Sequence, residues 1–477
     1  MLISARKFST IFLFCCIHYS VYSQGNFSHE DELKTEITDT ASKLSLRKII
    51  VTGNKKTKSY IILREMQVKP GDSVIISRIP DELDKARSFI YNTTLFVDVN
   101  VSALIVNAQE FDIIVHVIER WYIFPIPVFQ LADRSLNEWV DKHNADLNRV
   151  SYGIRFIHRN VSGRNDQFSI NVINGYTRNI SLNYRAPYSN PSLTEGVLVD
   201  GGYYQSREIP VLTTAQNDIF YFRKDDFVRN EWFARGAYLS RKGLTKRETF
   251  SLSFHHIRVD DSVISQQYNP GYFNSKSTTQ NFPEMEYKLQ YINVDNILYP
   301  LKGFTSSFIL NKRGLQLKDN INRLSLKAGY SVYFAHLNKW YSSLKFSGEI
   351  KLPFTQPFVN RRAIGYGEDY LRGYELYVID AAASAYAKFD LKKQVIRFNI
   401  PTLLNSKTYN KIPFRIYAKS FADLGYAYIQ QQFNTRLNNK VLCSGGIGID
   451  AVTIYDLKLS IEFSLNQLGQ KGLFLHY

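Results

Sequence analysis

The stretch that decides the fold is Asp456-Leu457-Lys458-Leu459-Ser460-Ile461-Glu462-Phe463-Ser464-Leu465, near the end of the chain. Every second residue in it is apolar, and the residues between are charged or small. This two-residue period is that of a β-strand with one apolar face and one polar face. A tilted strand of about ten residues crosses the hydrocarbon core of a bilayer. The stretch therefore predicts either a membrane-spanning strand or a strand of a soluble sandwich.

The same alternation recurs along the chain, at residues 285–291, 324–332 and 344–352. Strands of a soluble sandwich are usually shorter, and their polar face contacts bulk water. Segments of about ten residues with few prolines are instead typical of membrane-spanning strands. We count sixteen of them from residue 147 onward, one starting near residue 217.

An even number of long alternating segments predicts an all-β membrane protein, with a 16-stranded antiparallel transmembrane β-barrel over residues 126–477. A closed barrel is expected because lipid cannot satisfy the free backbone groups of a sheet edge. The apolar residues would then face lipid, and Lys, Glu, Ser and Asn would face a polar lumen.

The composition agrees with a strand-rich chain of 477 residues that contains 32 Tyr and 32 Phe. These residue types favour strands. The formal net charge is +16, but the basic residues are scattered singly between apolar ones, so we expect no nucleic-acid partner.

The N-terminus predicts export. Arg6 and Lys7 precede an apolar run at residues 8–17, so we expect a signal peptide at residues 1–23. Beyond it no run of 18 apolar residues occurs, which leaves a soluble exported protein or a barrel. The mature chain would keep only Cys443, which excludes an internal disulfide framework.

A polar linker is expected at residues 24–45, followed by a small domain at residues 46–120. Its pattern predicts the order βααββ, in which Thr57 caps the first helix. The second helix carries an apolar stripe formed by Ile79, Leu83, Ala86 and Ile90.

This domain resembles a POTRA domain. The features that carry the resemblance are Ile49-Ile50-Val51-Thr52-Gly53-Asn54, Pro70-Gly71-Asp72, Leu95-Phe96-Val97-Asp98-Val99 and Val117-Ile118-Glu119-Arg120. The resemblance implies a location in the periplasm, in front of an outer-membrane barrel. It also implies that a free sheet edge binds extended polypeptide by strand addition. A plain structural spacer is the alternative.

The last residues add a second resemblance. Gly472, Leu475 and the terminal Tyr477 lie in an alternating segment that ends on an aromatic residue. This ending looks like the terminal signal that the outer-membrane insertion machinery recognises.

A polar loop at residues 365–375 falls between the eleventh and twelfth expected strands. It contains Leu371-Arg372-Gly373-Tyr374, which matches the loop motif of the BamA/TamA superfamily of barrel-assembly and polypeptide-secretion proteins. The matching wall motif is Phe421-Ala422-Asp423-Leu424-Gly425 on strand thirteen, and the glycine-rich residues 444–450 follow on strand fourteen.

The resemblance implies that this loop folds into the lumen and that its arginine pairs with an acidic group on the inner wall. A guanidinium in a narrow lumen needs a carboxylate, and the pairing is often bidentate. Asp423 is the expected partner of Arg372, and Glu368 and Asp450 are further candidates.

The sequence predicts no enzyme, no cofactor and no metal site. It contains no G-x-S-x-G elbow and no phosphate-binding loop between a strand and a helix. His255 and His256 are adjacent, so on a strand they point to opposite faces.

Taken together, the resemblance implies a protein of the outer membrane of a Gram-negative-type envelope, with the POTRA-like domain in the periplasm. It would insert client proteins into that membrane or translocate them across it. The implied partners are outer-membrane lipid, an unfolded client polypeptide, and periplasmic or lipoprotein subunits. A passive channel or structural surface barrel without a polypeptide client is the alternative.

Overall fold

The computed structural model describes residues 41–131, 144, 146–314, 321–402, 411–430, 435–453 and 456–476. The expected signal peptide, most of the expected linker and Tyr477 lie outside these residues. Residues 43–477 form one compact unit. No helix in the described part of the chain is long and apolar enough to cross a membrane.

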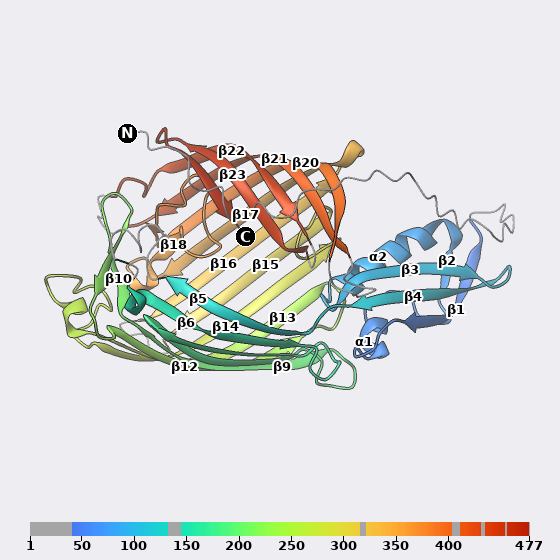
Figure 1. The fold of residues 1–477 in the computed structure, drawn as a ribbon, viewed down its shortest axis with the longest axis horizontal. Coiled ribbons are helices and arrows are strands. Elements are labelled where there is room, and N and C mark those ends of the chain that lie inside the picture. The colour runs from blue at the N-terminus through green and yellow to red at the C-terminus, as the bar shows by residue number, and fades with distance from the viewer. Residues whose placement is uncertain are drawn as a thin grey trace. The chain divides into compact units, whose positions relative to one another are not determined.

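The first elements form a small module with a four-stranded sheet and two helices (Figure 1). In chain order they are β1 (Lys43–Thr52), α1 (Ser59–Leu63), β2 (Ser73–Ile75), α2 (Ile79–Tyr91), β3 (Phe96–Ile105) and β4 (Glu110–Glu119). The strand order in the sheet is β2-β1-β4-β3, so β2 and β3 are its edges. The predicted order βααββ omits β2, because a three-residue strand is too short to show an alternating pattern.

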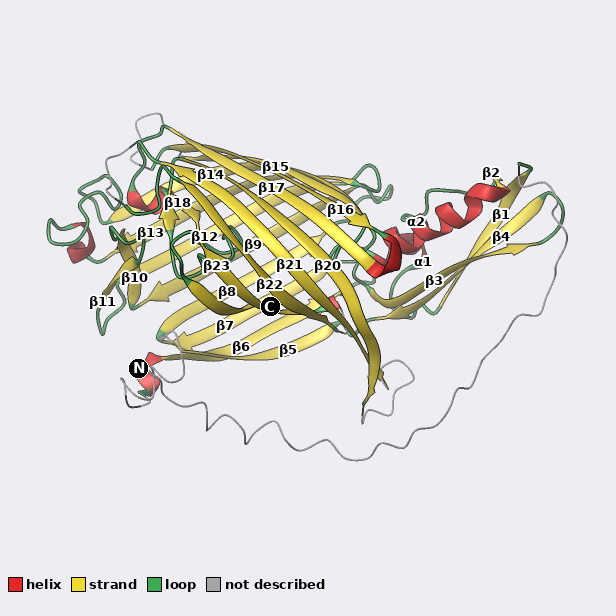
Figure 2. Ribbon diagram, turned by 90° about the horizontal axis from the view of Figure 1, so that it is seen from above, coloured by secondary structure: helices red, strands yellow, loops and turns green. Residues whose placement is uncertain are grey.

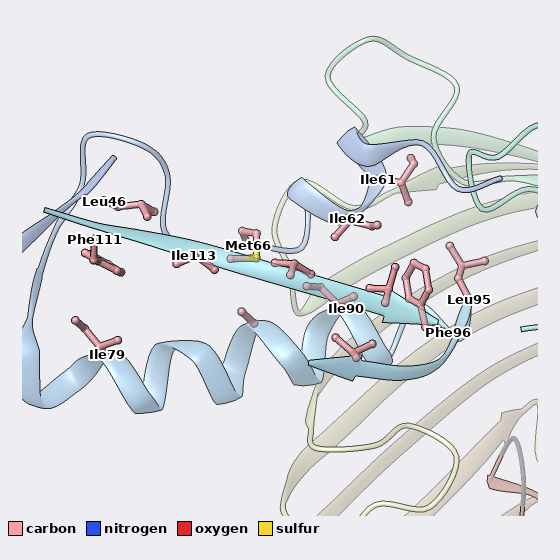
Figure 3. Packing of buried hydrophobic residues seen from close by; sticks show 14 of the residues in the cluster. Leu46, Ile61, Ile62, Met66, Ile79, Ile90, Leu95, Phe96, Phe111 and Ile113 are labelled. Carbon is pink, nitrogen blue, oxygen red and sulfur yellow. The ribbon is translucent and has the colours of Figure 1, made fainter. Parts of the chain in front are cut away.

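The core of this module lies between α2 and the sheet (Figure 3). The predicted stripe of α2 faces this core, with Ile79, Ala86 and Ile90 buried and Leu83 partly buried. The predicted cap of the first helix is wrong. Lys58 precedes α1 without a side-chain cap, whereas the Thr57 hydroxyl is hydrogen-bonded to the Tyr122 hydroxyl.

A sixteen-stranded sheet makes up most of the remaining chain (Figure 2). Each pair of neighbouring strands in it is antiparallel. In order across the sheet the strands are β5 (Ile123–Leu131), β6 (Val150–Arg159), β7 (Gln167–Gly175), β8 (Thr177–Ala186), β9 (Glu195–Ser206), β12 (Arg229–Ser240), β13 (Lys246–Val259), β14 (Thr279–Val294), β15 (Gly303–Arg313), β16 (Arg323–Ala335), β17 (Trp340–Leu352), β20 (Ala383–Pro401), β21 (Lys411–Tyr428), β22 (Val441–Val452), β23 (Lys458–Asn466) and β24 (Lys471–His476).

The predicted number of strands is confirmed, but one expected strand is wrong. The segment near residue 217 is β11 (Ile219–Arg223), which pairs with β10 (Glu208–Thr213) in a separate hairpin. The missing sheet strand is β5, whose Pro125 and Pro127 obscure the alternation. Proline is tolerated there because β5 is an edge strand. The two errors cancel, so the arginine loop still lies between strands eleven and twelve.

The faces of the sheet follow the predicted pattern, as β23 shows most clearly. Leu459, Ile461, Phe463 and Leu465 are each 43–46% exposed on the outer face, where lipid would lie. The alternate residues Ser460, Glu462, Ser464 and Asn466 are at most 4% exposed. The prediction of an apolar outer face and a polar lumen is confirmed.

The first and last strands of the barrel are the two edges of its sheet. The sheet runs from β24 at one edge to β5 at the other, and no ladder joins these two strands among the described residues. β24 has six residues, and its recorded partner is β23 alone. The first and last strands therefore form a seam, which we define as the outer edges of β5 and β24.

The small module is bonded to a turn of the large sheet through Glu65, which follows α1 and is fully buried. Arg241, in the turn between β12 and β13, donates from both terminal nitrogens to the Glu65 carboxylate at 2.6 and 2.7 Å. The same guanidinium also donates to the Tyr188 hydroxyl. A buried carboxylate with a bidentate partner fixes this junction.

Candidate functional site

The loop between β17 and β20 carries the candidate site. Its base is a short antiparallel hairpin made of β18 (Arg362–Ile364) and β19 (Ile379–Asp380). Gly365 follows β18 with φ at +91°, and a Cβ atom there would lie 2.2 Å from the Tyr377 carbonyl oxygen. Glycine is required at this position, since it lets the chain turn away from the hairpin toward the motif.

Arg372 at the tip of the loop is buried against Asp423. Their exposed fractions are 5% and 1%. Arg372 Nε and Nη2 donate to the two oxygens of Asp423 at 3.0 and 2.5 Å, and the Arg372 amide donates to Oδ2 at 2.9 Å. Asp423 lies five residues before the end of β21 at Tyr428, or roughly 17 Å along the strand. The loop tip therefore reaches into the lumen.

A second carboxylate also contacts Arg372, and the sequence analysis missed it. Arg372 Nη1 donates to Asp390 on β20, and Nη2 donates to the carbonyl oxygen of Phe389 at 3.3 Å. Asp390 pairs in register with Phe421 of the wall motif. An acidic residue directly opposite that motif on the neighbouring strand is the signal that could have identified it.

The wall motif supplies three contacts from alternate positions of β21. The Phe421 ring lies 4.1 Å from the Arg372 guanidinium carbon, within the range of a cation–π interaction. The Asp423 carboxylate forms an ion pair with the Arg372 guanidinium. Gly425 leaves space for Leu371, because a Cβ atom at this position would lie 2.5 Å from a methyl carbon of Leu371. Every second residue of the motif thus contacts the loop.

The rest of the loop motif contacts the next two strands. Gly373 has φ at +84°, and a Cβ atom there would lie 3.3 Å from the Cβ of Ser444 on β22 and 3.4 Å from that of Ser464 on β23. Asn466 Nδ2 donates to the Gly373 carbonyl at 2.7 Å. The buried Tyr374 hydroxyl donates to the Cys443 carbonyl at 3.1 Å. The four motif residues therefore bind β20, β21, β22 and β23 together.

The other predicted residues lie elsewhere. Glu368 is exposed, and no contact with Arg372 is recorded for it among the described residues. Asp450 is fully buried but pairs with Lys419 at 2.5 Å and accepts hydrogen bonds from Ser460 and Tyr299. Gly472 and Leu475 lie on β24, where Leu475 is exposed on the outer face.

The chemistry of this site is charge pairing. A buried guanidinium between two carboxylates has its charge compensated by short, charge-assisted hydrogen bonds. Removing one partner of a buried pair leaves an uncompensated charge and costs about 3 to 5 kcal/mol. The arrangement joins one residue of the loop to two neighbouring strands of the wall, β20 and β21.

The sixteen-stranded sheet, its apolar outer face and the small module define a class: transmembrane β-barrels preceded by a POTRA domain. Residues 45–120 match the POTRA family model, described as a surface antigen variable number repeat. These residues are a POTRA domain, and the resemblance predicted from the sequence is confirmed.

Among solved structures, BamA from Haemophilus ducreyi lacking POTRA domains 1-3 is similar in fold, with a TM-score of 0.50 and 15% identity. That match covers 91% of this chain and 83% of the other. CdiB from Acinetobacter baumannii matches with a TM-score of 0.47 and 14% identity, over 91% and 73% of the two chains. CdiB from Escherichia coli matches with 0.49 and 10%, over 94% and 92%.

No curated protein sequence matches the chain. At 15% identity, the similarity to BamA shows the fold: the chain has a BamA-like barrel together with a POTRA domain.

Proposed function

We propose that this protein lies in the outer membrane of a Gram-negative-type envelope, with its POTRA domain in the periplasm. There it inserts client proteins into the membrane or translocates them across it, without enzymatic chemistry. The POTRA domain receives the unfolded client, and the barrel passes it on. Energy for the process comes from folding and insertion of the client.

The observation that carries the proposal is the seam. β5 and β24 are the two edge strands of the sheet, and no ladder extends it beyond either of them among the described residues. In lipid, a backbone group left unsatisfied at such an edge costs several kcal/mol. An extended client strand that adds to either edge satisfies these groups, which is the physical basis of strand addition. The seam therefore favours an extended polypeptide as the ligand.

The POTRA domain offers a second edge of the same kind. Its edge strand β3 is ten residues long, and Leu104 and Ile105 at its end are 51% and 44% exposed. The opposite edge, β2, has three residues. β3 is thus the edge at which we expect a client, or a periplasmic or lipoprotein subunit, to bind.

We propose that the arginine loop is a latch for the wall next to the seam. Its contacts join β20, β21, β22 and β23, the four strands that precede β24. Holding these strands in one arrangement fixes the shape of the lumen beside the seam. The seam is where a client strand would be accepted or released.

The seam proposal predicts where a client is captured by photocrosslinking. A photoreactive phenylalanine analogue at Phe129 on β5, which is 64% exposed, is expected to form adducts with client polypeptide in growing cells. The matched control is Phe308 on β15, the ninth of the sixteen strands, which is also exposed on the outer face. A side chain next to an added strand lies about 5 Å from it.

Adducts are measured by immunoblotting and mass spectrometry after irradiation. Polypeptide adducts at position 129 and none at position 308 support client addition at the seam. Equal labelling at both positions, or none at position 129, contradicts it and favours a passive barrel.

A further inference from the structure

Three side chains that could ligate a metal converge beside the arginine loop. They are Glu375, which follows the loop motif, Glu462 on β23 and His476 on β24. One ligand atom from each lies within 4.8 Å of the others. His476 Nε2 is 3.4 Å from Glu375 Oε1 and 3.3 Å from Glu462 Oε2. We propose that this triad is a binding site for a divalent transition metal, with Zn²⁺ as the best fit.

The ligand atoms at this site have no close polar partner except one another. Glu462 is only 3% exposed, yet its Oε2 atom forms no hydrogen bond among the described residues. The same is true of His476 Nε2 and of both carboxylate oxygens of Glu375. Buried polar atoms are nearly always hydrogen-bonded, so several that meet only one another, at 3.3 to 3.4 Å, leave room for a ligand between them.

The two separations from His476 fit a metal better than a direct hydrogen bond. Zn²⁺ binds His nitrogen and carboxylate oxygen at about 2.0 to 2.1 Å, which places the ligand atoms of a tetrahedron about 3.3 to 3.4 Å apart. Both distances from His476 Nε2 have this value, and all three ligand atoms lie within 4.8 Å of one another. A charge-assisted hydrogen bond between a protonated histidine and a carboxylate would be about 2.7 to 2.9 Å long.

The donor set also selects the class of metal. One imidazole nitrogen with two carboxylate oxygens suits Zn²⁺ and its neighbours in the first transition row. Ca²⁺ and Mg²⁺ prefer sites made wholly of oxygen. Three protein ligands leave a fourth tetrahedral position for water.

Neighbouring residues hold two of the ligands in place. Lys419 donates to Glu462 Oε1, which leaves Oε2 directed at the site. The Tyr370 ring stacks on His476 with centroids 5.1 Å apart and an interplanar angle of 20°. Such outer contacts orient metal ligands and raise affinity.

A metal here would tie the arginine loop to the last two strands of the sheet. His476 lies on β24, whose recorded strand partner is β23 alone, and Glu375 lies on the loop. The metal would therefore fasten the strand at the seam from the lumen side. The inference rests on the contacts of the triad and is independent of whether the protein handles a client.

The test uses the full mature chain without a histidine tag, refolded in detergent and freed of metal with a chelator. We expect calorimetry with Zn²⁺ to give one site per chain. Substituting Co²⁺ should produce the visible absorption of a four-coordinate site. Glu375→Gln and His476→Ala should each weaken Zn²⁺ binding at least tenfold.

His336→Ala is the matched control, because this exposed histidine lies before β17 and is hydrogen-bonded to Ser342. It should bind Zn²⁺ like the wild type. Heat-dependent electrophoretic migration checks that each barrel is folded, and Glu375→Gln alters no strand. Absence of a stoichiometric site in the wild type, or equal binding by wild type, Glu375→Gln and His476→Ala, overturns the proposal and indicates an adventitious ion only.

Discussion

Replacing Arg372 with alanine is expected to give a barrel that still inserts but no longer supports client handling. The substitution removes the cation that Asp423 and Asp390 share, so both carboxylates lose their partner. Because Asp423 is buried, losing its partner should destabilise the loop and wall by about 3 to 5 kcal/mol. The loop would then leave the wall, although the outer face that contacts lipid is unchanged.

Three measurements check this prediction: complementation of a depleted strain, surface and membrane fractionation, and the temperature of the electrophoretic shift. Arg155→Ala is the matched control, since Arg155 is an exposed arginine on β6 that donates to Asn171. It should behave like the wild type. An Arg372→Ala variant that matches the wild type in both stability and client handling contradicts the latch.

A double-mutant cycle separates the pair from a general packing effect. Arg372→Met combined with Asp423→Leu removes both charges of this pair and leaves only Asp390 without its partner, so the free energy of unfolding should fall by less than the sum of the two single changes. Fully additive changes would show that the two residues do not interact.

Replacing Gly425 with valine is expected to displace the loop without altering any charge. Its side chain would occupy the space of Leu371, since a Cβ atom alone would lie 2.5 Å from that residue. Overpacking of this kind costs about 1 to 3 kcal/mol. We expect an exogenous protease to cut the loop at the cell surface, and client handling to fall as with Arg372→Ala.

Gly236→Val on β12 is the matched control, because a Cβ atom at Gly236 meets nothing within 4 Å. It should leave the loop protected and function intact. If Gly425→Val leaves the loop as protected as in the wild type, the packing of Leu371 against β21 does not hold the loop.

The sequence alone allowed the fold class to be predicted, because the alternation in segments such as β23 is set by the two faces that the strand presents. The prediction missed β5, because Pro125 and Pro127 interrupt the alternating pattern on this edge strand. The prediction also missed β2, because this strand pairs with β1 through three residues only.

The residues of the candidate site could likewise be predicted only in part from the sequence. Asp423 could be predicted from a motif, whereas Asp390 is recognised only through the register that places it opposite Phe421. The metal triad could not be predicted, since Glu375, Glu462 and His476 come from three separate segments and no local spacing connects them. Long-range register and loop placement decide both sites.

The most direct test of the proposed function is controlled depletion of the protein, followed by a quantitative inventory of outer-membrane and secreted proteins. We predict loss of polypeptide clients: selective loss of one secreted protein would identify a dedicated exporter, and broad loss of barrels an assembly factor. An unchanged inventory after complete depletion would contradict the proposal and indicate a passive channel or structural barrel.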